Sequence, residues 1–156
     1  MPGGWGAVPL VKCETTLNWL RARAKIAEIV MSVCNGASLL AAAGILDGRQ
    51  ATTNKLLWKE ATEPGPKVNW VKQARWVDLG TIITASGIAA GMDMTHALIT
   101  RLYGKDVATW LGRVQRVTSQ ILSNCLFKVA ILLVSFLFRI RSRGRYRRSF
   151  YWQNHA

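Results

Sequence analysis

One cysteine stands in a setting that could support nucleophilic chemistry. Cys34 is the central residue of Ser32-Val-Cys-Asn-Gly36, which follows an apolar run and precedes a helix-favouring run. A nucleophile elbow has this order of strand, sharp turn and helix, and it needs small residues two positions before and after the nucleophile. The N-terminus of the helix would favour the thiolate. The N–H of Asn35 would point to the place where an oxyanion forms.

The same pattern also fits a structural cysteine buried ahead of a helix, because free cysteine is among the most buried residue types. The local sequence alone does not decide between the two interpretations. The other cysteines, Cys13 and Cys125, show no CxxC or Cys/His spacing, which argues against a disulfide framework and against a zinc site. We therefore expect a reduced, intracellular setting, no metal and no cofactor.

The elements that must position Cys34 alternate between strands and helices, which indicates an α/β domain with a mainly parallel sheet. Met92 and His96 are expected on one buried face of the helix over 88–103. The histidine is interpreted as a packed or partly exposed residue rather than a catalytic one. The helices are expected over residues 14–25, 37–43, 55–61, 88–103 and 106–116, and the strands over 28–33, 51–53, 75–77 and 81–84.

The net charge of +13 is concentrated near the C-terminus. Residues 121–156 hold 7 Lys and Arg and no acidic residue, whereas residues 1–120 hold 14 basic and 8 acidic residues. The basic character therefore describes a tail more than a domain. Nucleic acid is not an expected partner of the folded core.

The tail itself has two parts. Residues 121–138 are mostly apolar, but Lys128 lies near their centre. A membrane-spanning helix needs about 20 mostly apolar residues, and a charge at its centre is costly. We expect an apolar segment that docks on the core or is disordered, with a membrane-spanning helix, and hence a membrane partner, as the alternative. Residues 139–156 are expected to form a disordered basic tail.

Four blocks of residues 1–120, one of which contains the elbow, resemble the ThiJ/PfpI family, and in particular its isonitrile hydratase-like and fungal branch. The longest block runs from Met31 to Asn54 and contains the elbow. The others are Pro2-Gly-Gly4, the pair Val68-Asn-Trp70 and Ala74-Arg-Trp-Val77, and Thr84-Ala-Ser-Gly-Ile-Ala-Ala-Gly-Met-Asp93. Residues 118–156 do not resemble the C-terminus of the family.

This resemblance implies a class I glutamine amidotransferase-like, flavodoxin-like fold in which helices sandwich the sheet. It implies that Cys34 is the catalytic nucleophile. It also implies that the backbone N–H groups of Gly4 and Asn35 form the oxyanion hole. Five further residues are expected to shape the pocket, namely Gly3, Gly36, Gly87, Gly91 and Asp93.

The sequence also departs from the family. Relatives carry β-α units before the Pro-Gly-Gly turn, and the first of these supplies a carboxylate that contacts the cysteine. This chain starts on that turn, so we expect a domain that is incomplete at its N-terminus. Glu14 and Glu28, the acidic residues before Cys34, do not match that carboxylate. Asn54 stands where many relatives carry His, which puts a catalytic base from that position in doubt.

Three functions stay open at this point. The first is a cysteine-dependent hydratase, hydrolase or glyoxalase-type enzyme that acts on a small electrophilic substrate. The second is a catalytically impaired family remnant, or a regulatory or binding module. The third is membrane association through residues 121–148. We expect a cytoplasmic homo-oligomer with a small-molecule substrate, and the alternative location is the membrane.

Overall fold

The computed structural model describes the backbone of residues 1–121 and the side chains of residues 1–114. The chain divides into two compact units, Met1–Ala108 and Thr109–Ala156. The elbow and the four family-like blocks all lie in the first unit. Apart from residue 121, the apolar segment 121–138 and the basic tail 139–156 lie outside the described residues, and so do the predictions made for them.

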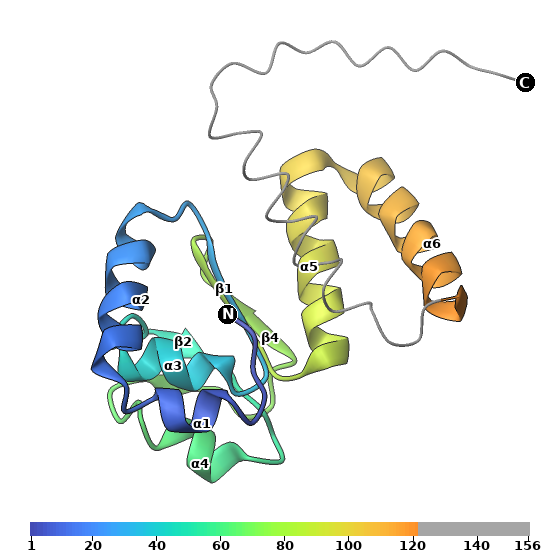
Figure 1. Ribbon diagram of the computed structural model, residues 1–156. Helices are drawn as coiled ribbons and strands as arrows, with labels where there is room; N and C mark the ends of the chain where they lie inside the picture. The colour runs from blue at the N-terminus through green and yellow to red at the C-terminus, as the bar shows by residue number, and fades with distance from the viewer. Residues whose placement is uncertain (122–156) are drawn as a thin grey trace, which may run out of the picture. The chain divides into compact units, whose positions relative to one another are not determined.

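A three-stranded sheet with the order β1-β5-β4 runs through the first unit (Figure 1). β1 and β5 are parallel, whereas β5 and β4 form an antiparallel hairpin where the sequence predicts one. A separate pair of parallel strands, β2 and β3, lies beside it. The strands are β1 (Val30–Val33), β2 (Gln50–Ala51), β3 (Asn69–Trp70), β4 (Trp76–Asp78) and β5 (Ile82–Ala85).

Helices cover both faces of the three-stranded sheet. In Figure 1, α1 to α4 lie on one side of β1, and α5 lies on the other. α6 begins in the first unit and continues into the second. The helices are α1 (Ala7–Leu10), α2 (Glu14–Ile26), α3 (Gly36–Ala42), α4 (Trp58–Thr62), α5 (Ile88–Tyr103) and α6 (Lys105–Ile121).

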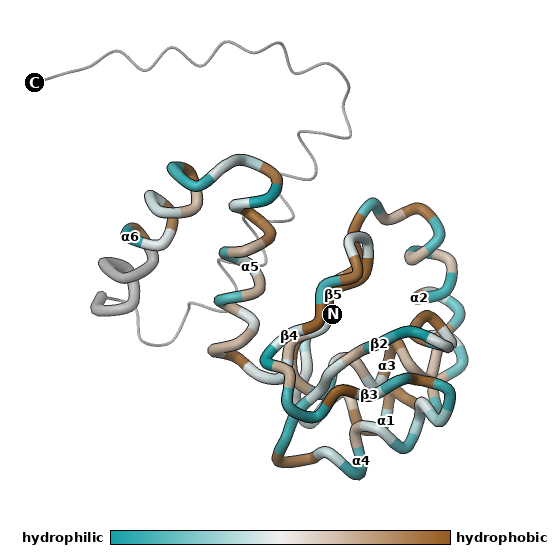
Figure 2. Tube along the Cα trace, turned by 180° about the vertical axis from the view of Figure 1, so that it is seen from behind, coloured by the Kyte–Doolittle hydropathy of each residue, from teal (hydrophilic) through white to brown (hydrophobic). Residues whose placement is uncertain are grey.

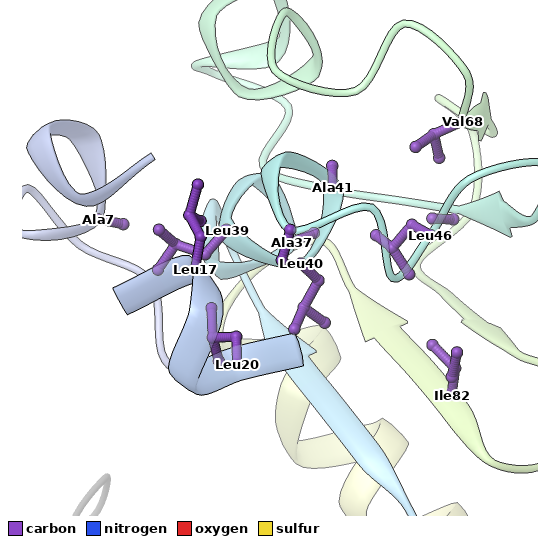
Figure 3. Packing of buried hydrophobic residues seen from close by; sticks show 12 residues of the cluster. Ala7, Leu17, Leu20, Ala37, Leu39, Leu40, Ala41, Leu46, Val68 and Ile82 are labelled. Atoms are coloured by element: carbon purple, nitrogen blue, oxygen red, sulfur yellow. The ribbon is translucent and has the colours of Figure 1, made fainter. Parts of the chain in front are cut away.

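The core has one apolar cluster on each side of the sheet. β5 is apolar along most of its length in Figure 2, and all four of its residues are buried. Successive residues of a strand point to opposite faces. Ile82 accordingly packs with α2 and α3, and Ile83 packs with α5. Figure 3 shows Leu17 and Leu20 of α2 beside the leucines of α3.

The buried face of α5 differs from the predicted one. Met92 and His96 are exposed, so their assignment to a buried face is wrong. Ala90, Met94 and Leu98, spaced by four residues, form the buried stripe instead. Gly91, which follows Ala90 and is also buried, is the small residue that lets this side of the helix approach β1. A Cβ placed on Gly91 would lie 3.0 Å from both methyl carbons of Val33.

Two short elements were not predicted, and one helix is longer than predicted. α1 contains Pro9, and β3 has only two residues. α6 starts at Lys105 and reaches Ile121, beyond the predicted end at residue 116. Within the part of the chain that the structure describes, no helix is both long and apolar enough to span a bilayer.

Candidate functional site

Cys34 lies between the end of β1 and the start of α3, in an unusual backbone conformation. Its φ is 60°, and it is the single non-glycine residue with a positive φ among residues 1–121. The left-handed region costs an ordinary residue about 1–2 kcal/mol. Strain of this kind gathers at functional sites. The sharp strand–turn–helix geometry that the sequence predicts is therefore present.

Two hydrogen bonds hold the strained residue in place. The Cys34 N–H donates to the carbonyl of Ala85 at 2.9 Å, and the hydroxyl of Thr53 donates to the carbonyl of Cys34 at 3.0 Å. Ala85 ends β5, and Thr53 follows β2. Both peptide groups that flank the Cys34 Cα are therefore fixed by segments distant in sequence, which offsets the cost of the turn.

The small residues around Cys34 leave room for the N-terminal turn. A Cβ on Gly36 would lie 2.7 Å from the carbonyl oxygens of Met1 and Pro2. A Cβ on Gly3 would lie 2.8 Å from the Cβ of Cys34. Real Cβ atoms do not approach other atoms so closely, because interiors are already close-packed. The Pro2-Gly-Gly4 turn therefore lies against the elbow, as the resemblance implies.

Gly4 and Asn35 are joined by a reciprocal pair of hydrogen bonds. The Gly4 N–H donates to Oδ1 of Asn35 at 2.7 Å, and Nδ2 of Asn35 donates back to the carbonyl of Gly4 at 3.1 Å. The N–H expected in the oxyanion hole from Gly4 is thus engaged in this conformation. The backbone N–H of Asn35, in contrast, has no hydrogen-bond acceptor among the described residues.

The sulfur of Cys34 has one polar side-chain partner. Nδ2 of Asn54 donates to Sγ of Cys34 at 2.9 Å. Oδ1 of the same amide accepts the N–H of Leu57 at 2.8 Å, which fixes the orientation of the Asn54 side chain. Cys34 as a whole residue is partly exposed. An amide at this position orients the thiol but cannot act as a general base.

The remaining predicted pocket residues lie on or near α5. Gly87 precedes the first turn of α5 in an extended conformation, and Gly91 packs against Val33, which precedes Cys34. Asp93 is exposed, and its carboxylate forms an ion pair with Arg75. Gly91 therefore supports the strand that leads into Cys34, whereas Asp93 binds a side chain from the loop before β4.

Sequence reasoning missed a cationic group in the loop that carries Asn54. Nζ of Lys55 lies 4.8 Å from the ring centroid of Trp58, and Nζ of Lys72 lies 5.9 Å from the same centroid. Burial, followed by the charge of Lys72, lowers the pKa of Lys55 below its ordinary value of 10.5. The i,i+3 spacing of Lys55 and Trp58 was a local signal, but nothing local indicated the approach of Lys72.

Cys13 is a second thiol with a distinctive environment. It precedes the first turn of α2, and the hydroxyl of Thr16 donates to its Sγ at 3.3 Å. This hydrogen bond, helped by the N–H of the same threonine, lowers the pKa of the Cys13 thiol. Among the described residues, no group of three His, Cys, Asp or Glu side chains could hold a metal ion.

The comparison with known protein families decides the relationship. Residues 1–101 match the model of the DJ-1/PfpI family, and this range contains the elbow, the Pro2-Gly-Gly4 turn and the glycines of α5. The chain belongs to the DJ-1/PfpI family. The resemblance inferred from the four blocks is confirmed, and so is the class I glutamine amidotransferase-like, flavodoxin-like fold that it implied.

Two curated proteins are also similar to this chain. Isonitrile hydratase from Pseudomonas putida is 40% identical over 112 residues, which cover 69% of this chain and 46% of the relative. The HTH-type transcriptional regulator GlxA from Rhizobium meliloti is 37% identical over 92 residues, which cover 57% of this chain and 27% of the relative. The chain thus spans less than half the length of these curated relatives.

Solved structures of the DJ-1/PfpI family share the fold. DJ-1beta from Drosophila melanogaster superposes with a TM-score of 0.58 at 18% identity, covering 71% of this chain and 59% of its own. A ThiJ/PfpI family protein from Pseudomonas syringae superposes with a TM-score of 0.56 at 21% identity, covering 83% and 61%. At these identities the likeness concerns the fold.

Proposed function

We propose that this DJ-1/PfpI chain is a cysteine-dependent enzyme of the hydratase or hydrolase type, with Cys34 as the nucleophile. The observation that carries the proposal is the strained φ of 60° at Cys34, held by hydrogen bonds from both sides. A structural cysteine would gain nothing from this conformation, whereas a nucleophile gains an exposed position at a turn.

Hydration of an isonitrile is the reaction that the similarity to isonitrile hydratase favours. The thiolate of Cys34 would add to the terminal carbon, and the same carbon takes up a proton, which gives a thioimidate with a C=N bond; the nitrogen takes up its proton only in the next step. Water then adds to the same carbon, and departure of the thiolate releases an N-substituted formamide. One molecule of water is added in total, and nothing is oxidised. The amide of Asn54 would hold the sulfur in place during both steps.

The test is turnover of a small aliphatic isonitrile by the purified protein, with the formamide product followed by NMR. We expect Cys34→Ala to abolish turnover and the matched variant Cys13→Ala to retain it. Full activity of Cys34→Ala would contradict the proposal. We expect the wild-type rate to be low, because one oxyanion-hole donor is typically worth about 10²–10³-fold in rate and Gly4 does not offer its N–H freely.

The hydrogen bond from the Gly4 N–H to Asn35 also favours a second candidate function. This is a regulatory or binding module that keeps the elbow without efficient catalysis. The hydrogen bond from Gly4 to Asn35 engages the N–H that an oxyanion would need. Asn35→Ala would free the Gly4 N–H. A higher turnover in Asn35→Ala than in the wild type would show an enzyme whose activity is limited by this bond. If neither the wild type nor Asn35→Ala turns over isonitriles, esters or dicarbonyls, the binding module is favoured.

We further propose that the protein is a cytoplasmic homo-oligomer. The exposed apolar side chains of Trp5, Val8 and Leu10 around the N-terminal turn support an interface there. Light scattering coupled to size-exclusion chromatography would test the assembly, and a monodisperse monomer would contradict it.

A further inference from the structure

Two lysine side chains converge on one tryptophan ring in the neighbourhood of the elbow. Lys55 and Lys72 both place their ammonium groups over Trp58, at 4.8 and 5.9 Å from the ring centroid. Trp70 meets the same ring edge-on, with 6.2 Å between centroids and an interplanar angle of 74°. The indole of Trp70 in turn donates to the carbonyl of Gly65 at 3.0 Å. The platform under the two cations is therefore anchored.

Among the residues whose side chains the structure describes, neither Lys55 nor Lys72 has an anionic partner. The ion pairs of the described residues join Glu14, Asp47, Asp78 and Asp93 to other basic side chains. Lys55 donates one hydrogen bond, to Oγ1 of Thr52 at 2.5 Å, and an ammonium has three donors. Burial, and after it the charge of Lys72, lowers the pKa of Lys55. A bound anion would relieve this mutual repulsion and use the free donors.

The loop that carries Lys55 also contacts the nucleophile. Thr53 donates to the carbonyl of Cys34, and Asn54 donates to its sulfur. Lys55 is the next residue along the chain, and its side chain folds back onto Thr52 in the same loop. The loop that supplies the hydrogen bond to the sulfur of Cys34 therefore also carries the cationic group, one residue further along the chain.

We propose that Lys55, Lys72 and Trp58 form a subsite for an anionic group, a carboxylate or a phosphate, on the molecule that Cys34 attacks. This inference rests on the proposed function of Cys34 and specifies its substrate class as a small anionic electrophile. The ammonium groups supply charge and hydrogen-bond donors, and the indole face supplies an apolar surface for the carbon atoms next to the anion.

Two alkylating reagents of similar size test the subsite without any turnover. Iodoacetate carries a carboxylate and iodoacetamide is neutral, and both transfer their methylene carbon to the thiolate with loss of iodide. The ratio of their rates at one cysteine cancels the fraction of thiolate, so it reports the local preference for an anion. The full-length protein would be labelled at low ionic strength, and the modification of Cys34 and Cys13 would be followed separately by mass spectrometry.

We expect the iodoacetate-to-iodoacetamide ratio at Cys34 to fall about twofold to fivefold in Lys55→Gln and in Lys72→Gln, and further in the double variant. Lys67→Gln is the matched control, because Lys67 is an exposed lysine already paired with Asp47. Inorganic phosphate at constant ionic strength should slow the reaction of iodoacetate at Cys34 more than that of iodoacetamide, whereas sodium chloride should not.

An unchanged ratio in the double variant would overturn the proposal. An equal fall at Cys13, or an equal fall in Lys67→Gln, would also overturn it, because the effect would then come from overall charge. The two proposals fail separately. A falling ratio without turnover of any substrate would leave the anion subsite in place and remove the enzymatic function. Turnover with an unchanged iodoacetate-to-iodoacetamide ratio would leave the enzymatic function in place and remove the anion subsite.

Discussion

Asn54 donates a hydrogen bond from Nδ2 to the sulfur of Cys34, with 2.9 Å between the two atoms. The chain therefore presents a neutral donor, rather than a base, to its candidate nucleophile. The N–H of Leu57 binds the other end of the amide, so the side chain cannot turn around without losing that bond.

Replacing this donor by an anion should slow the reaction of Cys34. Asn54→Asp keeps an oxygen for the N–H of Leu57 but places a negative charge beside the sulfur, which disfavours the thiolate. We expect alkylation by iodoacetamide at neutral pH to slow about tenfold, equivalent to about 1.4 kcal/mol. Asn69→Asp, at an exposed amide bound to the carbonyl of Gly48, is the control. Equal rates in the two variants would show that the contact is unimportant.

The strain at Cys34 should be visible in stability. Cys34→Gly and Cys34→Ala both remove the sulfur, but glycine adopts a φ of 60° without penalty. The left-handed region costs alanine about 1–2 kcal/mol, and the more flexible unfolded chain of the glycine variant offsets about 0.4–1 kcal/mol. Urea unfolding should therefore show the glycine variant to be more stable by about 0.5–1 kcal/mol. An alanine variant of equal or greater stability would argue against strain.

The N-terminal turn should not tolerate a side chain at Gly3. In Gly3→Ala the new Cβ would lie 2.5 Å from Oδ1 of Asn35 and 2.8 Å from the Cβ of Cys34. Overpacking of this kind costs about 1–3 kcal/mol. Gly6→Ala is the matched change, since nothing lies within 4 Å of its Cβ position and its φ is −64°. Thermal unfolding should separate the two variants, and similar transitions would place the turn away from the elbow.

The reactivity of Cys13 should depend on Thr16. The hydroxyl of Thr16 is the largest cause of the lowered pKa of the Cys13 thiol, and Thr16→Val removes it while keeping the shape of the side chain. The pKa should rise, so less thiolate is present at neutral pH and iodoacetamide should label Cys13 more slowly. The labelling rate of Cys34 serves as the internal reference. If the labelling rate of Cys13 is the same in Thr16→Val as in the wild type, the Thr16 hydroxyl does not bind the Cys13 sulfur in solution.

The elbow and the β4–β5 hairpin could be predicted from the sequence, because apolar runs, Gly80 and the small residues beside Cys34 are local signals. β3 could not be predicted, since a two-residue strand exists only through its pairing with β2. The engagement of Gly4 by Asn35 depends on one side-chain rotamer. The meeting of Lys72 with Lys55 requires two segments that the sheet brings together. Local patterns therefore predicted the strand–turn–helix geometry at Cys34, and long-range packing determined its surroundings.

The hydrogen bonds at Cys34 also bear on the order of events during folding. Its N–H reaches β5, and its carbonyl is bound by the segment after β2. Each bond forms only once its own distant segment has come together with β1, so the left-handed turn has its full support only when both segments are in place. The reactive geometry would then be created only once the sheet is complete, which protects an unfinished chain from premature chemistry at its thiol.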